Sequence, residues 1–352
     1  MREWILTQLG LNPDLATPYE MFRAADAVHQ GIGILLLSVV DCSGDLPLSP
    51  AAKAVLDRQR RRLHLLDSYA DTALMDAPTG RVVKGSTIRR TYETGLCRSQ
   101  TDVDLVFSNP SDLWHAAARL QRTDEFDDPK LVVIGSDLTK VCLQFSCPAP
   151  DVFFDKPILV ELAPTPFYGD GGSVRTRYDL PSDPLLLSLM AICEERFQRK
   201  FHMRDGLDMN RLVSALSKEM PSWEEACVEN ARVLRLAPEL LELWEYARSM
   251  SLAADPPTEL RHLADMEAQS RGEKDTALLP PDLRGLFVGG AINEDPESFT
   301  VIGTRGSKRA VRTPVGCFIL TESDTVTEDE VRWAREIAGA GSSAPSISGR
   351  RT

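Results

Sequence analysis

The segment Asp102–Phe107 constrains the fold of this chain more than any other stretch, because acids alternate with apolar residues there. Side chains on a β-strand point to opposite faces in turn, so Asp102 and Asp104 should share one face, opposite to Val103. Two neighbouring carboxylates repel each other, and burying them without partners is costly. Mg²⁺ ions would resolve this conflict, because Mg²⁺ takes oxygen ligands from carboxylates and substrate phosphates. The strand therefore predicts a site for two Mg²⁺ ions that can support a phosphoryl displacement.

A turn made of Lys84, Gly85 and Ser86 precedes this strand. Gly85 lets the backbone approach a phosphate closely, and Ser86 offers a hydroxyl and an N–H where a helix is expected to begin. Lys84 can supply positive charge to a triphosphate and a departing pyrophosphate. Three arginines that follow can do the same, namely Arg89, Arg90 and Arg98. These residue types predict that the turn binds the triphosphate of an NTP substrate.

A third carboxylate would complete a metal site or deprotonate the attacking hydroxyl. Glu161 is the preferred candidate, because it lies inside the apolar run Ile158–Leu162, where a metal on a neighbouring strand would explain an acid. Asp151 and Asp155 are alternatives, and they lie in a region typical of a turn. We therefore expect Glu161 to join the two aspartates as a catalytic residue and as a ligand of Mg²⁺.

The order of these motifs resembles the DNA-polymerase-beta-type nucleotidyltransferase superfamily, in which a Gly-Ser turn precedes an Asp-x-Asp strand and a lone acid on a later strand. More narrowly, it is similar to a family of bacterial nucleotidyltransferases whose core reads Lys-Gly, Tyr, Arg and Asp-x-Asp-Leu. The residues that carry this narrower resemblance are Lys84, Gly85, Tyr92, Gly95, Arg98, Asp102, Val103, Asp104 and Leu105. The resemblance implies a Mg²⁺-dependent enzyme that moves an NMP from an NTP to an acceptor and releases pyrophosphate.

Three other interpretations stay open at this point. An Asp-x-Asp sequence is by itself a weak signal, and it also occurs where a β-turn precedes an edge strand with exposed acids. A toxin-like nucleotidyltransferase acting on tRNA or on a protein would use the basic run Arg58–Arg62 along an RNA path, although such a run is also typical of a solvated helix face. A nucleotide-binding regulator or scaffold would keep the fold without performing chemistry.

The formal net charge of -12 bears on the acceptor. It disfavours duplex DNA and anionic membranes as partners, and favours a small molecule, a peptide or a protein. The seven cysteines form no Cys-x-x-Cys pair or Cys/His cluster, which predicts reduced thiols rather than zinc ligands or disulfides. The first residues lack a signal-peptide core, and the longest apolar run, near Ile32 to Val40, is too short to span a bilayer. We therefore expect a cytoplasmic protein.

Periodicity and turn residues predict an α/β (α+β) fold, with a small mixed sheet flanked by helices. The expected segments are a helical N-terminal arm at 1–77, a nucleotidyltransferase core at 78–183, a mainly helical part at 184–338 with short β pieces at 286–320, and a disordered tail at 339–352. Within the core, strands are predicted at 81–84, 103–107, 131–134, 141–145 and 158–162, with a helix at 111–122. The Gly-rich segment 167–183 is predicted to be a loop or lid, in which Arg175 and Arg177 either close over substrate phosphates or are solvated. A hairpin turn is predicted at Gly303–Lys308.

Overall fold

The computed structural model describes residues 1–12, 14, 16–44, 46–123, 125–134, 140–149, 151, 155–271, 283–290, 299–322 and 325–339. The chain divides into two compact units. Unit 1 is assembled from Met1–Asp71, Arg81–Ser108 and Thr165–Ala277. Unit 2 is assembled from Thr72–Gly80, Asn109–Pro164 and Leu278–Thr352. Each unit thus combines three separate stretches, whereas the segments predicted from the sequence follow one another along the chain.

The first described residues of unit 1 form α1 (Arg2–Gln8), α2 (Pro18–Val28), α3 (Gln30–Ser43) and most of α4 (Pro50–Leu74). A capping box starts α2, because the Thr17 hydroxyl accepts a hydrogen bond from the Glu20 N–H while the Glu20 carboxylate accepts one from the Thr17 N–H. Apolar residues of α3, among them Ile32 and Leu35, are buried in the core of this unit. The predicted helical N-terminal arm is therefore present.

The segment that carries the predicted site motifs forms β1 (Gly80–Val83), α5 (Gly85–Arg89) and β2 (Asp102–Phe107), and β1 neighbours β2. Val103 and Leu105 are each 1% exposed, whereas Asp102 is exposed and Asp104 is half-buried. The two acids therefore lie opposite the apolar face of β2, as the alternation of residues predicts.

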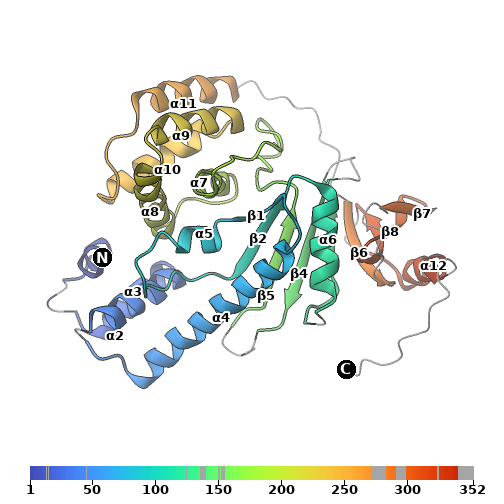
Figure 1. Ribbon diagram of the computed structural model, residues 1–352, viewed down its shortest axis with the longest axis horizontal. Helices are drawn as coiled ribbons and strands as arrows, with labels where there is room; N and C mark the ends of the chain where they lie inside the picture. Colours follow the sequence, from blue (N-terminus) through green and yellow to red (C-terminus); the bar gives the residue numbers. More distant parts are fainter. Residues whose placement is uncertain are drawn as a thin grey trace. The chain divides into compact units, whose positions relative to one another are not determined.

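The rest of unit 1 is helical, as predicted for this part of the chain. It contains α7 (Pro184–Glu194), the short 3₁₀ helix η1 (Glu195–Phe197), α8 (Met203–Glu219), α9 (Trp223–Leu234), α10 (Ala237–Ser249) and α11 (Thr258–Arg271). Figure 1 shows α8, α9 and α10 gathered around α7. Because α7 is apolar on nearly all sides, every residue from Leu185 to Glu194 is buried. This helix is the central element of the unit 1 core.

The predicted loop before α7 is exposed at several positions, but an internal ion pair connects it to the core of unit 1. Phe167 and Arg177 form an isolated β-bridge, and the Arg177 guanidinium pairs with the buried Glu194 carboxylate. The Arg177 side chain is only 9% exposed. The expectation of a solvated Arg177 is therefore wrong, because its charge is neutralised inside unit 1, whereas Arg175 is exposed. The predicted contact of either arginine with substrate phosphates stays a prediction.

The described residues of unit 2 form α6 (Pro110–Gln121), seven strands and α12 (Glu328–Gly339). The strands are β3 (Lys130–Val133), β4 (Val141–Cys147), β5 (Ile158–Ala163), β6 (Leu283–Gly289), β7 (Thr300–Arg305), β8 (Lys308–Thr313) and β9 (Gly316–Thr321). Within this unit they lie in the order β5-β4-β3-β6-β9-β8-β7, and every neighbouring pair is antiparallel. The helices and strands of the two units confirm the predicted α+β class.

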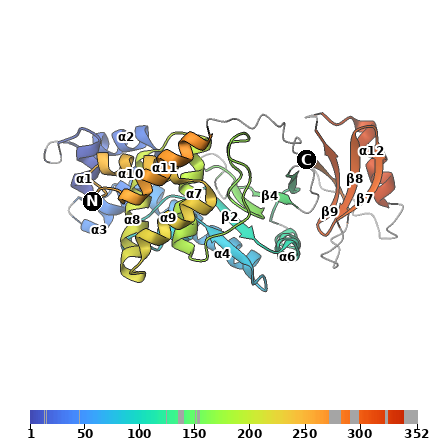
Figure 2. The same ribbon diagram turned by 90° about the horizontal axis from the view of Figure 1, so that it is seen from above.

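The C-terminal part of unit 2 is a hairpin-rich sheet region covered by a helix. Figure 2 shows α12 beside β7 and β8, and the helix also contacts β6 and β9. A Cβ atom at Gly303 would lie 2.8 Å from Ile337 Cδ1, so the glycine permits this close approach. The predicted hairpin turn is confirmed, since Arg305 pairs with Lys308 across the β7–β8 turn. Neither β8 nor α12 is predicted from the sequence pattern, and residues 340–352 of the predicted tail lie outside the described residues.

Candidate functional site

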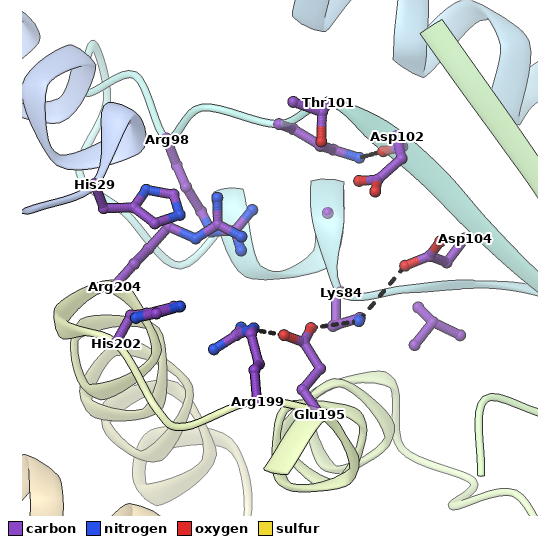
Figure 3. Close-up of a pocket in the computed structure, with 13 residues that line it drawn as sticks. His29, Lys84, Arg98, Thr101, Asp102, Asp104, Glu195, Arg199, His202 and Arg204 are labelled. Carbon is purple, nitrogen blue, oxygen red and sulfur yellow. Dashed lines mark hydrogen bonds and ion pairs between the residues drawn. The ribbon is translucent and has the colours of Figure 1, made fainter. Parts of the chain in front are cut away.

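A cavity of about 330 Å³ opens in unit 1 between α3, the β1–α5 turn, the start of β2 and the segment from η1 to α8. Figure 3 shows the side chains around it. Its lining residues are His29, Val83, Lys84, Gly85, Arg98, Gln100, Thr101, Asp102, Asp104, Glu195, Arg199, His202 and Arg204. The predicted residues Lys84, Gly85, Arg98, Asp102 and Asp104 are thus brought together in one cavity.

The Lys84 ammonium lies between two carboxylates of this cavity (Figure 3). Its Nζ atom is 2.6 Å from Glu195 Oε1 and 3.6 Å from Asp104 Oδ2. Burial disfavours the charged ammonium, but Asp104 and Glu195 together hold the pKa of Lys84 above its usual value. The lysine therefore stays protonated and provides a fixed positive charge beside β2.

Glu195 lines the cavity although no sequence motif predicts it as a site residue. It follows the buried helix α7, and its carboxylate receives Lys84 on one oxygen and the Arg199 guanidinium on the other. Burial alone would raise the pKa of Glu195, but the attraction of Lys84 and then of Arg199 lowers it below its usual value. Glu195 is therefore ionised at neutral pH and connects η1 to the turn directly and to Asp205 of α8 through Arg199.

The turn at Gly85 packs tightly against the loop that precedes β2. Lys84 has φ 60° and Gly85 has φ 38°, and a Cβ atom at Gly85 would lie 2.3 Å from Gln100 Nε2. That same Nε2 donates a 2.6 Å hydrogen bond to the Asp102 carbonyl. Only a glycine leaves room for this contact, which connects the predicted phosphate-binding turn to the strand that carries the aspartates.

Arg98 reaches the cavity but is held by a buried counter-ion. Its Nε and Nη2 atoms donate to the two carboxylate oxygens of Asp208 at 2.8 and 2.6 Å. The Tyr92 hydroxyl donates a third hydrogen bond, of 2.8 Å, to the same carboxylate. Burial would lower the pKa of Arg98, yet Asp208 and Tyr92 raise it above its usual value. The guanidinium therefore connects the loop that precedes β2 to α8 through its ion pair with Asp208, in addition to any contact with a substrate.

Two of the other predicted residues lie away from the cavity lining. The Arg89 guanidinium pairs with Asp67 on α4 and donates to Gln100 Oε1. Ser86 is buried in the short helix α5. Their predicted contacts with the triphosphate stay predictions, and Arg89 would have to exchange its present partner to make one.

Glu161 lies on β5 in unit 2, opposite Gln144 of β4, and is half-buried. Its predicted partnership with Asp102 and Asp104, which belong to unit 1, stays a prediction. Within the described residues, no group of three or more histidine, cysteine, aspartate or glutamate side chains is arranged to hold a metal ion. Any ion in the cavity would therefore take further ligands from the substrate or from water.

Basic residues from α3 and α8 form the wall of the cavity that the sequence did not predict. The rings of His29 and His202 have centroids 5.8 Å apart, and His29 Nδ1 accepts a hydrogen bond from the Gly31 N–H. Burial, and then the charges of Arg204 and His202, lower the pKa of His29. These residues come from parts of the chain more than a hundred positions apart, and no local spacing connects them.

The basic run on α4 is also partly structural. Arg60 pairs with Asp41, and the buried Arg62 donates a 2.8 Å hydrogen bond to the Thr101 carbonyl next to Asp102.

Among the described residues, no helix has the length and apolar composition that crossing a membrane requires. Comparisons of the chain with protein-family models, with curated proteins and with solved structures found no match.

Proposed function

We propose that this protein is a Mg²⁺-dependent nucleotidyltransferase that moves an NMP from an NTP to a small-molecule, peptide or protein acceptor and releases pyrophosphate. One observation carries the proposal: the Lys84–Gly85 turn and the carboxylates of Asp102 and Asp104 line the same cavity of unit 1. A glycine turn suits the close approach of phosphates, and paired carboxylates suit a hard cation. Neither group alone would favour this chemistry.

The donor set of the cavity fits Mg²⁺. Asp102 and Asp104 offer oxygen ligands from one face of β2, and both are accessible from the cavity. Mg²⁺ is commonly held by one or two carboxylates together with substrate phosphates and water. When bound, the ion supplies charge neutralisation and polarisation at the phosphoryl group.

The remaining residues of the cavity serve to bind and orient the NTP. Lys84 is positioned by Glu195 to balance the charge of the triphosphate and of the departing pyrophosphate. The Glu195 carboxylate, which is kept ionised, acts as a positioning residue for this lysine. Gly85 exposes the backbone of the turn to the phosphates.

The ion pair of Lys84 with Asp104 also favours a second candidate function. An ammonium beside this carboxylate satisfies its charge without a metal, as a nucleotide-binding regulator that performs no chemistry would require. The two functions differ in their dependence on Mg²⁺. Isothermal titration with each NTP, with and without Mg²⁺, separates them, because metal-independent NTP binding favours the regulator.

The catalytic proposal is tested by pyrophosphate release from each NTP in the presence of Mg²⁺ and a panel of acceptors. Asp102→Asn and Asp104→Asn should each lower the rate by at least about 100-fold, because each removes charge at the reacting centre. Asp71→Asn is the matched control, since Asp71 is an exposed aspartate on α4. Normal release by both site variants would show that the proposal is wrong.

A further inference from the structure

The α3–α8 wall of the cavity, defined here as His29, His202 and Arg204, carries basic groups that the proposed chemistry does not use. Figure 3 shows these three side chains near one another, away from Asp102 and Asp104. His29 precedes α3, while His202 and Arg204 lie at the start of α8. The cavity therefore has a carboxylate side at β2 and a basic side at α3 and α8.

Most of the positive charge around the cavity is already neutralised by carboxylates. The ion pairs that do this are Lys84 with Asp104 and Glu195, Arg98 with Asp208, and Arg199 with Glu195 and Asp205. Within the described part of the chain, Arg204 forms no close ion pair, although its charge also attracts Glu195 and helps to lower the pKa of that carboxylate. A guanidinium that faces a cavity without a counter-ion is a favourable partner for an anionic ligand.

The two imidazoles add hydrogen-bond donors beside this arginine. Because His29 Nδ1 accepts the 2.9 Å hydrogen bond from the Gly31 N–H, its neutral ring carries the proton on Nε2 and donates from there. His202 is exposed and precedes the 17-residue helix α8, whose first turn already contains Asp205 as acceptor of the His202 N–H. The nearby acids, Glu195 and Asp205, are both occupied by Arg199.

We propose that Arg204, His29 and His202 form a binding subsite for a phosphate group. A phosphate offers several acceptor oxygens and at least one negative charge, which suits one guanidinium and two imidazole donors. Its source is either the terminal phosphate of the NTP or a phosphate carried by the acceptor. The assignment to one of these sources rests on the proposed function, whereas the phosphate subsite itself does not.

The test is titration calorimetry of inorganic phosphate and tripolyphosphate into the full chain and into Arg204→Gln. We expect the variant to bind both anions at least about tenfold more weakly, because it has lost a charge-assisted hydrogen bond to the anion. Lys218→Gln is the matched control, because it removes one positive charge from the exposed far end of the same helix. Unchanged affinity of Arg204→Gln for both anions, with its unfolding midpoint unchanged, would overturn the proposal.

Competition distinguishes the two sources of the phosphate. If the subsite holds the terminal phosphate of the NTP, ATP should displace inorganic phosphate, and Arg204→Gln should weaken ATP binding more than AMP binding. If it holds a phosphate of the acceptor, inorganic phosphate should still bind at saturating ATP, and the variant should bind ATP normally. Phosphate binding that depends on Arg204 without any NTP-dependent transfer would refute the proposed function and leave the subsite standing.

Discussion

Removal of the Asp208 carboxylate is expected to destabilise unit 1 strongly, because it would leave the Arg98 guanidinium buried without a counter-ion. The side chain of Arg98 is 5% exposed and that of Asp208 is 1% exposed, so water would replace the lost partner only in part. Breaking a buried ion pair by removing one partner typically costs about 3–5 kcal/mol. We expect Asp208→Asn to lower the free energy of unfolding by an amount near the lower end of this range, because asparagine keeps the shape of the side chain and one acceptor oxygen.

Two further variants separate the buried charge from the hydrogen bonds. Tyr92→Phe removes only the 2.8 Å hydrogen bond to Asp208 and should cost about 1.5–3 kcal/mol, the range for bonds to charged groups. The double variant Arg98→Met with Asp208→Leu removes both charges, and replacing a buried pair by apolar residues is often close to neutral. It should therefore be more stable than Asp208→Asn alone.

The assay is urea unfolding followed by tryptophan fluorescence, compared at the transition of unit 1. Three of the five tryptophans, Trp4, Trp223 and Trp244, belong to this unit. The reasoning is refuted if the free energy of unfolding of Asp208→Asn lies within about 1 kcal/mol of that of the parent chain, which is the effect of an ordinary substitution. It is also refuted if the double variant loses as much stability as the single one.

Two other substitutions test contacts within unit 1. The ion pair with Lys84 lowers the pKa of Glu195 below its usual 4.5, so this carboxylate stabilises the fold above that pH and stops doing so as the pH falls. Lys84→Met removes the ion pair, and the free energy of unfolding should therefore decrease less in acid than it does for the parent chain. Urea midpoints at pH 6 and in acid measure this, and an unchanged pH dependence would contradict it. Gly169→Ala should destabilise far more than Gly171→Ala, because both have positive φ but only at Gly169 would a Cβ lie 1.9 Å from the Val174 carbonyl oxygen. Thermal unfolding compares the two, and equal melting temperatures would contradict the steric argument.

The elements around the site could be predicted from the sequence because their signals are local. Apolar runs bounded by turn residues located β1 and β2 within a residue or two, and the alternation in Asp102–Phe107 placed the two acids on one face. In contrast, β8 mixes charged and apolar residues without a regular period over Lys308–Thr313. Its pairing with β7 and β9 on both sides, rather than its own pattern, makes it a strand.

The side of the cavity formed by η1, the start of α8 and the residue before α3 could not be predicted from the sequence, because tertiary packing alone brings these residues together. Glu195 follows a helix that is apolar on nearly all sides, and the sequence offers no spacing that relates it to Lys84. A signal did exist for Asp208, since it lies four residues before Leu212 on the buried side of α8. A charged residue at a core position predicts a buried partner, although not that the partner is Arg98.

The interleaving of the two units determines when the cavity can form during synthesis. His29 belongs to the first stretch of unit 1, the aspartates of β2 to the second, and Arg204 to the third. The ribosome therefore completes residues 109–164 of unit 2 before it has made the last wall of the cavity. The predicted core 78–183, produced as a fragment, would contain Asp102 and Asp104 but lack the side chains from α3, η1 and α8. A contiguous segment exchanged between proteins would accordingly have to run from at least His29 to Arg204 to transfer every residue that lines this cavity.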